Sequence, residues 1–500
     1  MAFRATYLAL LAVTVVGQLA ALGFEIAVAA RFGTGRDADA LAFALMLVVT
    51  LTGELASWVS AIVVPLYLAA RATSVTGAAA FLRRVFAALL LVAGLIVVLL
   101  AVAAPVVVRV LAPALGPRGI AVLQAFAPLL VFAPLAALFG AALQAHGRFA
   151  GAGARQLAWY GGGLVAVILL GPAWGVLAVP FGIVAGMAMF AAALAVPARA
   201  LTRSADGADR GPSLARVGTL LLPLALLSAA LLCNVAVERA LAARLPEGSL
   251  AALTYAYRLL HFPLALFLVN ATAMLLPTMA GHAARGEDEI SDALTRRALR
   301  VTLVFVVPLA ALAIALAEPL TAVLLQRGAF TASSTASTAT AIAWYAPSIV
   351  TAALIQVLLR VYQARQALWR LAAMVGASIA VNIVLMAGLT ALAGFRGLPL
   401  AASLSGVVLV ALMLRGLRDR APGLAGVLTD GASVAVVGAG LAALAAAWLV
   451  RDLAAGALPA LVLGAAAGAG VYAGALATLA PNEARAALAV LVPAASSRPA

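Results

Sequence analysis

The sequence predicts an all-α, polytopic membrane protein with about 14 transmembrane helices, and three observations support this prediction. Of the 500 residues, 66% are hydrophobic and only 10% are charged, whereas soluble domains are about a quarter charged. The apolar residues form blocks of about 18 or more, the length that crosses ~30 Å of hydrocarbon. Only helices and closed barrels span lipid, and barrel strands would alternate apolar with polar residues. Continuously apolar blocks therefore indicate a helical bundle.

The limits of the predicted spans follow from charged residues and Gly/Pro breaks between the apolar blocks. The first block leads directly into further apolar helices, which favours a first span over a cleaved leader. The break at Gly171-Pro172 divides two short spans that would form a tight hairpin. The predicted spans are 6–30, 40–68, 85–110, 119–145, 156–173, 176–198, 217–240, 250–281, 300–325, 338–363, 370–395, 397–415, 428–450 and 457–480.

The distribution of arginine predicts the orientation of the chain in the membrane. All 32 basic residues are Arg, and loops that face the cytoplasm are enriched in basic residues. With the amino terminus inside, 22 Arg lie on the cytoplasmic side and nine on the outer side, with Arg258 inside a span. The nine outer residues are Arg31, Arg36, Arg109, Arg118, Arg239, Arg244, Arg327, Arg396 and Arg451. We therefore expect a multi-pass protein of the bacterial cytoplasmic (inner) membrane with both termini in the cytoplasm.

The net charge of +15 does not predict a nucleic-acid partner, because the Arg residues are scattered among the loops instead of forming one patch. Contact with anionic headgroups of membrane lipids accounts for them. The single cysteine, Cys233, can form neither an internal disulfide nor a Cys-based metal site. We expect no bound metal and no catalytic residues.

An internal repeat predicts how the spans are grouped. The segment AARFGTG at 29–35 is followed by AARLPEG at 242–248, about 213 residues later. Each copy starts a unit of six spans, so the two halves share one orientation, as in transporters with parallel repeats. The predicted domains are an N-lobe at 1–200, a C-lobe at 213–420 and a final helix pair at 425–482.

Several polar side chains lie inside predicted spans, where an ionisable group costs several kcal/mol unless it faces a cavity or a partner. In span 250–281, Arg258 and His261 share a face, Tyr255 lies one turn earlier and Pro263 interrupts the helix. These residues favour an amphipathic cavity in which Arg258 attracts a diphosphate. The alternative is that Arg258 pairs with a buried carboxylate and that His261 is an ordinary core histidine.

The carboxylates of the first two spans complete this candidate cavity. Glu54 lies near the middle of span 40–68, and Glu25 lies near the outer end of span 6–30, with Gln18 two turns deeper. Either carboxylate could balance the cavity charge or couple transport to a cation. The alternative is that Glu54 only neutralises Arg258 and that Glu25 is solvated.

Two further groups of polar residues are weaker candidates. Arg31 and Asp39, with two charged neighbours, lie at the outer mouth of the first two spans, where they form either a gate or a solvated loop. Asn234 and Asn382 are midspan amides that could bind a monovalent cation, although interhelical hydrogen bonds are the alternative.

Four segments of the second half resemble successive signatures of the MurJ/MviN lipid II flippase family, within the multidrug/oligosaccharidyl-lipid/polysaccharide exporter superfamily. They are YRLLHFP at 257–263, LLP at 275–277, QRGAFT at 326–331 and YQARQ at 362–366. The first half matches at fewer positions, which are Phe32-Gly33, Gly35, Asp39-Ala40, Pro65, Leu143-Gln144 and Arg148-Phe149.

This resemblance implies two six-helix lobes around a cationic cavity, with spans 13 and 14 forming a groove for a polyprenyl tail. Arg258 falls on one of the cavity arginines of the family. The chain departs from the family at Glu25, where the family pattern after Gly-Phe is Arg-Asp, and at Thr52 to Glu54, where the family has an Arg pair. These changes remove cations and should weaken binding of a diphosphate.

The sequence therefore predicts a flippase, not an enzyme, that moves a lipid-linked cell-wall precursor of the undecaprenyl-diphosphate type to the outer leaflet by alternating access. The alternatives are a flippase for an exopolysaccharide unit, an ion-coupled exporter of small molecules and a transport-inactive scaffold. No cofactor is expected beyond a monovalent cation or the membrane potential for coupling. Its partners would be the lipid-linked saccharide, membrane lipids and a cell-wall or polysaccharide synthesis machinery.

Overall fold

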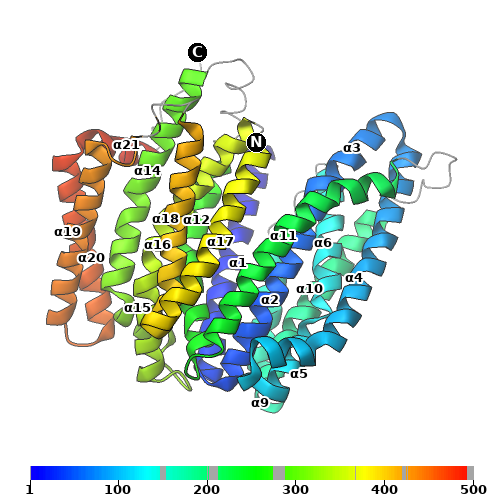
Figure 1. Cartoon of the computed structure of the whole chain (residues 1–500), viewed down its shortest axis with the longest axis horizontal. Helices are drawn as coiled ribbons and strands as arrows, with labels where there is room; N and C mark the ends of the chain where they lie inside the picture. The colour runs from blue at the N-terminus through cyan, green and yellow to red at the C-terminus, as the bar shows by residue number, and fades with distance from the viewer. Residues whose placement is uncertain are drawn as a thin grey trace. The chain divides into compact units, whose positions relative to one another are not determined.

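The computed structural model of the chain describes residues 2–146, 154–199, 201, 212–273, 288–365, 367–418, 424 and 426–491, and these residues are almost entirely helical. They divide into two compact units (Figure 1). The first comprises Met1–Ala251 with Arg327–Thr331, and the second comprises Ala252–Gln326 with Ala332–Ala500.

The first unit contains the amino-terminal helices. They are α1 (Ala2–Phe32), α2 (Arg36–Trp58), η1 (Val59–Val63), α3 (Val64–Thr73), α4 (Val75–Leu111), η2 (Pro113–Leu115), α5 (Gly116–Phe126), α6 (Leu129–Gln144), α7 (Ala154–Gln156), η3 (Leu157–Gly161), α8 (Gly162–Leu169), α9 (Gly171–Trp174), η4 (Gly175–Leu177), α10 (Ala178–Arg199) and α11 (Leu214–Ala242).

The second unit contains the remaining helices, apart from the first residues of α12. They are α12 (Ser249–Ala273), α14 (Asp288–Ala315), α15 (Ala317–Leu325), α16 (Ala332–Ala364), α17 (Leu368–Ala393), η5 (Gly394–Arg396), α18 (Gly397–Leu417), α19 (Gly431–Leu453), α20 (Ala457–Leu479) and α21 (Pro481–Leu491).

The helical fold class is confirmed, since every predicted span overlaps a helical segment of the structure. Within the described residues, ten helical segments are long and apolar enough to cross a membrane. The chain is thus a multi-span membrane protein. The predicted break at Gly171-Pro172 is present, because α8 ends at Leu169 and Gly175 turns the chain into α10 with a φ of 56°. The sequence analysis missed the short helix α21, which follows the last span.

Glycine allows unusually close packing of α10 on η3 and α8 in the first unit. A Cβ atom on Gly182 would lie 2.4 Å from the carbonyl oxygen of Gly162, and one on Gly186 would lie 2.1 Å from the carbonyl oxygen of Ala158. Interfaces between membrane helices favour small residues because the attraction comes from close packing, lipid being as apolar as the helix surface.

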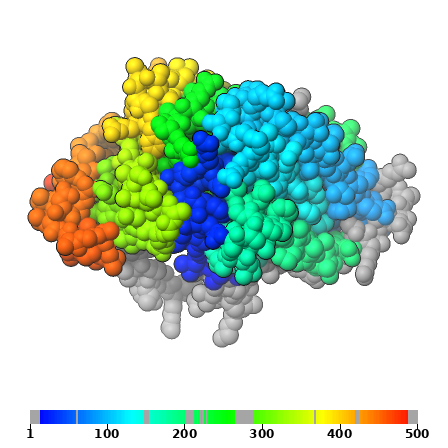
Figure 2. All heavy atoms as spheres, turned by 90° about the horizontal axis from the view of Figure 1, so that it is seen from below, coloured from blue at the N-terminus to red at the C-terminus, as the bar shows by residue number. Residues whose placement is uncertain are grey.

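In the second unit, α19 and α20 form a pair that packs beside α14 and α15, as the end-on view shows (Figure 2). Gly440 of α19 lies directly on Val307 of α14, and the Tyr472 hydroxyl of α20 donates to the Val304 carbonyl at 2.7 Å. The final helix pair is therefore an integral part of this unit.

Asp430 fixes the start of α19. It accepts from the backbone N–H of Ser433 at 2.9 Å and also binds the Arg300 guanidinium of α14. Partial burial opposes ionisation of Asp430, but these hydrogen bonds hold the pKa of its carboxyl below the usual value. The carboxylate thereby caps one helix and ties it to another.

The two compact units differ from the predicted lobes, whose boundary lies between 200 and 213. The helix α11 packs along α2, so the structural boundary falls after Ala251. A unit defined by packing need not coincide with a unit defined by an internal repeat, and the lobe assignment stays a prediction.

We expect Gly186→Ala to destabilise the protein, because the added methyl group would meet the Ala158 backbone, which cannot rotate away. Overpacking of this kind typically costs about 1–3 kcal/mol. Gly94→Ala in α4 is the matched control, since a Cβ there meets no atom within 4 Å. Thermal unfolding of the two purified variants in detergent would measure the difference, and equal melting temperatures would contradict the close packing of η3 on α10.

Candidate functional site

Asp39 fixes the start of α12 to the start of α2. Its two carboxylate oxygens accept from the backbone N–H groups of Gly248 and Ala251, at 2.7 and 2.8 Å. The side chain is only 6% exposed. A helix begins with N–H groups that have no partner inside the helix, so Asp39 serves as a cap supplied by another helix. The interpretation as a solvated loop is wrong for this residue, because the carboxylate is buried and both of its oxygens accept hydrogen bonds.

The turn after α1 meets two other turns of the first unit at very short range. Ala329 donates its backbone N–H to the Ala30 carbonyl at 2.8 Å. Gly33, Gly248 and Gly328 all have positive φ, of 57°, 90° and 58°, and a Cβ on any of them would lie within 2.3 Å of a backbone oxygen of the facing turn. Only glycine combines this backbone conformation with such an approach.

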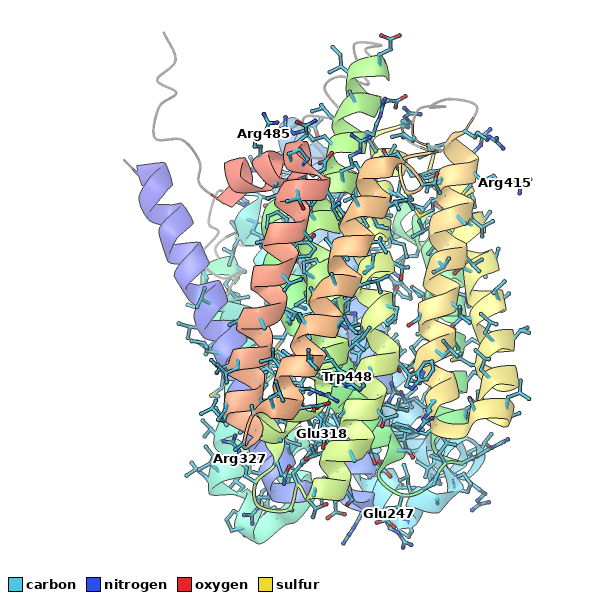
Figure 3. All side chains as sticks on the ribbon, turned by 90° about the vertical axis from the view of Figure 1, so that its left-hand side faces the viewer. Glu247, Glu318, Arg327, Arg415, Trp448 and Arg485 are labelled. Carbon is cyan, nitrogen blue, oxygen red and sulfur yellow. The ribbon has the colours of Figure 1, made fainter. Side chains whose placement is uncertain are left out.

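Two ion pairs surround this contact. Arg36 Nε lies 2.9 Å from Glu247 Oε2, and Arg118 Nη1 lies 2.5 Å from Asp37 Oδ1. Both pairs are solvent-exposed to a large degree, and exposed pairs contribute little stability. We call the Asp39 cap, the three glycine turns and these pairs the outer-end latch. Figure 3 labels Glu247 and Arg327 at this end of the helices.

The outer-end latch joins the two copies of the internal repeat. The first copy, at 29–35, supplies Gly33 and Thr34, and the second copy, at 242–248, supplies Glu247 and Gly248. A Cβ on Gly248 would lie 2.3 Å from the Thr34 carbonyl oxygen, so equivalent turns of the two copies lie against each other.

Glu54 is hydrogen-bonded inside the first unit. The Ser228 hydroxyl of α11 donates to Glu54 Oε2, and the indole N–H of Trp58 donates to the same hydroxyl at 3.1 Å. Ser228 is 3% exposed. The carboxylate therefore links the last turns of α2 to the middle of α11.

The other site candidates of the first unit lie on α1. Gln18 and Glu25 are buried, with 9% and 7% exposure, so Glu25 is not solvated as one interpretation held. The side chain of Arg31 is exposed and lies against Gly171, where a Cβ would come within 2.9 Å of its Nε. Arg31 thus packs on the turn between α8 and α10 beside the outer-end latch.

The candidates of the second unit are on α12. Tyr255 is buried at 4% exposure, and Arg258 is partly buried. The Nδ1–H of His261 donates to the Tyr257 carbonyl at 2.9 Å, and the His261 ring stacks on the Tyr257 ring with centroids 3.8 Å apart. A neutral imidazole held in this way leaves its Nε2 as an acceptor.

The two midspan amides lie in different units, Asn234 on α11 and Asn382 on α17. Asn382 contacts the sulfur of Met386 through Nδ2 at 3.9 Å. Among the described residues there is no cluster of three or more His, Cys, Asp or Glu side chains that could hold a metal ion.

Sequence reasoning missed several residues that hold these groups in place. The sequence did not single out Ser228 or Trp58, and it placed Arg239 among the outer-loop charges. Arg239 is in fact 2% exposed and pairs with Glu238 at 3.1 Å. Its position before the turn at 242–248 carried no signal of burial, because one sequence contains no record of which neighbours surround a helix end.

Comparison with known proteins identifies the family. The sequence model of the family described as "Lipid II flippase MurJ" matches residues 28–463, most of the chain. The chain belongs to the MurJ family. The predicted resemblance is therefore confirmed over a longer stretch than the motifs that suggested it.

Curated relatives of this MurJ-family chain match it at modest identity. A protein of Rhizobium meliloti named probable lipid II flippase MurJ is 28% identical over 383 residues, 72% of this chain and 70% of the relative. A protein of the same name from Bdellovibrio bacteriovorus is 31% identical, and lipid II flippase MurJ of Burkholderia cenocepacia is 28% identical. These two matches span only 35% and 41% of the relatives' lengths, and 37% and 42% of this chain.

Solved structures agree on the fold. A lipid II flippase MurJ in an inward closed conformation superposes with a TM-score of 0.81 and 18% identity, covering 95% of this chain and 99% of the other. An inward-facing multidrug resistance transporter of the MATE family gives a TM-score of 0.66 at 16% identity, over 82% of this chain and 95% of the other. The chain thus shares its fold with both of these proteins.

We expect Asp39→Ala to destabilise the protein markedly, because it leaves two backbone N–H groups without their acceptor. An unsatisfied buried donor costs about 1–3 kcal/mol. Arg36→Gln is the matched control, since it removes an exposed ion pair of the same latch, worth about 0.2–1 kcal/mol. If thermal unfolding showed the same loss for both variants, Asp39 would not act as the cap of α12.

Proposed function

We propose that this protein is a flippase that moves an undecaprenyl-diphosphate-linked sugar, of the lipid II type, from the cytoplasmic to the outer leaflet of the bacterial inner membrane. The observation that carries this proposal is the family match over residues 28–463. A flippase needs no bond-making residues, so the protein would be a transporter, not an enzyme. The predicted topology, with both termini in the cytoplasm, places the outer-end latch on the side of release.

The outer-end latch supports a mechanism of alternating access. It consists of hydrogen bonds, glycine contacts and exposed ion pairs, each worth about 1 kcal/mol. Such contacts close one side of a transporter yet remain reversible, because a conformational equilibrium responds to ligand energies of only a few kcal/mol. Binding of substrate from the cytoplasmic side would shift this equilibrium towards an outward-open state.

Within this proposal, Arg258 is the cation that recognises the diphosphate. A guanidinium forms charge-assisted and bidentate hydrogen bonds with phosphate oxygens. Tyr255 and His261 are the further candidate residues beside it on α12, and Gln18, Glu25 and Glu54 are the candidates on the helices of the first unit. Coupling to the membrane potential or to a monovalent cation, with Asn234 and Asn382 as candidate ligands, belongs to the same proposal, as do membrane lipids and a cell-wall synthesis machinery as partners.

The buried carboxylates favour a second candidate, an ion-coupled exporter of small cationic molecules. Glu25 is 7% exposed, and the fold is shared with multidrug transporters. A flippase for exopolysaccharide units and a transport-inactive scaffold are the other candidates. Unlike the leading proposal, these candidates predict that the protein cannot replace the lipid II flippase of a cell.

The decisive experiment is to express this gene in a bacterium depleted of its own lipid II flippase. Growth of the depleted cells would support transport of lipid II. Failure to grow, with normal expression and membrane insertion, would overturn the lipid II assignment in favour of the other candidates.

We expect Arg258→Ala to weaken binding of a polyprenyl-diphosphate sugar by about 10- to 100-fold, because hydrogen bonds to charged groups contribute roughly 1.5–3 kcal/mol. Arg258→Lys should restore part of this affinity through its charge. The matched control is Arg370→Gln, which removes an exposed Arg from the start of α17. Titration of the purified variants with the substrate would measure the change, and normal affinity for Arg258→Ala would remove this residue from the site.

A further inference from the structure

A groove of about 570 Å³ runs along α18 on the second unit. Its long wall is a single stripe of α18, because residues three, four and seven positions apart share one helix face. The described residues that line the groove are Val407, Val410, Ala411, Leu414, Arg415 and Arg418 of α18 and its carboxy-terminal end, Thr351 and Leu354 of α16, and Leu428 and Thr429 before α19.

The groove is apolar along most of its length. Its floor is closed, with Leu354 and Val410 each 4% exposed, whereas Val407 at the rim is 55% exposed. From Val407 to Arg418 the helix rises by about 16 Å at 1.5 Å per residue. The groove is therefore long, narrow and open on the side that α18, as part of a candidate membrane span, presents outward.

Two arginines stand at one end of the groove. Arg415 and Arg418 are exposed, and no described residue that lines the groove is acidic. Figure 3 shows Arg415 at the same end of the second unit as Arg485, the end predicted to be cytoplasmic.

Other arginines of the second unit are used differently. Arg365 pairs with Asp292 at 2.6 Å, and Arg485 donates to Asn482 at 2.9 Å. Within the described part of the chain, Arg415 and Arg418 form no ion pair or side-chain hydrogen bond. Their charge favours the carboxy-terminal end of α18, but their guanidinium donors remain available to a phosphate.

We propose that this groove binds one anionic phospholipid of the cytoplasmic leaflet, with its phosphate at Arg415 and Arg418 and an acyl chain along the α18 stripe. None of the described residues that line the groove belongs to the candidate substrate site on α12, and the proposal does not depend on the flippase function. The bound lipid would join α18 to the segment at 428–429 that leads into α19.

Charge and shape together favour this occupant. A basic pocket between membrane helices near the cytoplasmic surface suits an anionic headgroup. The narrow apolar stripe suits a flexible chain, and every bilayer supplies one at this depth. A zwitterionic phospholipid would fill the groove but gain less from the two arginines. The polyprenyl tail of the substrate is the competing occupant.

Native mass spectrometry of the full-length protein in detergent, titrated with dioleoylphosphatidylglycerol, tests the headgroup contacts. Arg415→Gln/Arg418→Gln should weaken binding about 30-fold, equivalent to about 2 kcal/mol for two basic residues near the phosphate. The control, Arg370→Gln/Arg485→Gln, removes two exposed charges elsewhere and should leave binding unchanged. Dioleoylphosphatidylcholine should bind the unaltered protein more weakly than the anionic lipid.

A second pair of variants tests the groove itself while keeping both arginines. Ala411→Trp places a large side chain in the groove and should weaken phosphatidylglycerol binding at least tenfold, whereas Val384→Trp on exposed α17 surface should not. Unchanged binding in Ala411→Trp would mean that the arginines attract headgroups without a groove, which overturns the proposal. Tighter binding of undecaprenyl phosphate, lost in Ala411→Trp, would overturn it in favour of the substrate tail.

Discussion

The structure depends on one constraint, that lipid offers no hydrogen-bond partner to a peptide group. Inside a helix the peptide groups bond to one another, but the first N–H groups of each helix need an acceptor from elsewhere. Asp39 meets this need for α12, and Asp430 meets it for α19. In both cases the acceptor also connects to a second helix, so capping and tertiary packing are achieved by the same carboxylate.

Glycine meets a second requirement. Backbones must approach each other closely in lipid, where the hydrophobic effect does not hold them together. At Gly33, Gly248 and Gly328, a backbone oxygen of the facing turn occupies the space that a Cβ atom would need. Because these contacts contain few side chains, they exclude lipid and water without a large apolar interface. A contact area of this kind can separate at low cost, which suits an end that must open and close.

The sequence predicted the fold well because its signals are local. Continuous apolar blocks marked the long helical segments, although not the short helix α21, and the break at Gly171-Pro172 was correctly placed by residue type alone. The candidate site was harder to predict. Glu54 was recognised as an ionisable midspan residue, but its partner Ser228 lies 174 positions away and has no unusual sequence context. Asp39 was assigned to either a gate or a solvated loop, and only the fold reveals the helix start that it caps.

The positions of Asp39 and Glu54 have a joint consequence for α2. They are fifteen residues apart, so about 22 Å of helix separates them. Asp39 holds the segment that follows α11, and Glu54 holds Ser228 within α11. Two contacts at this separation resist tilting of α2 against α11, since a tilt that keeps one contact must break the other. A change of state that moves these helices apart therefore has to release both carboxylates, and the opening proposed for the outer-end latch includes the release of Asp39 from the start of α12.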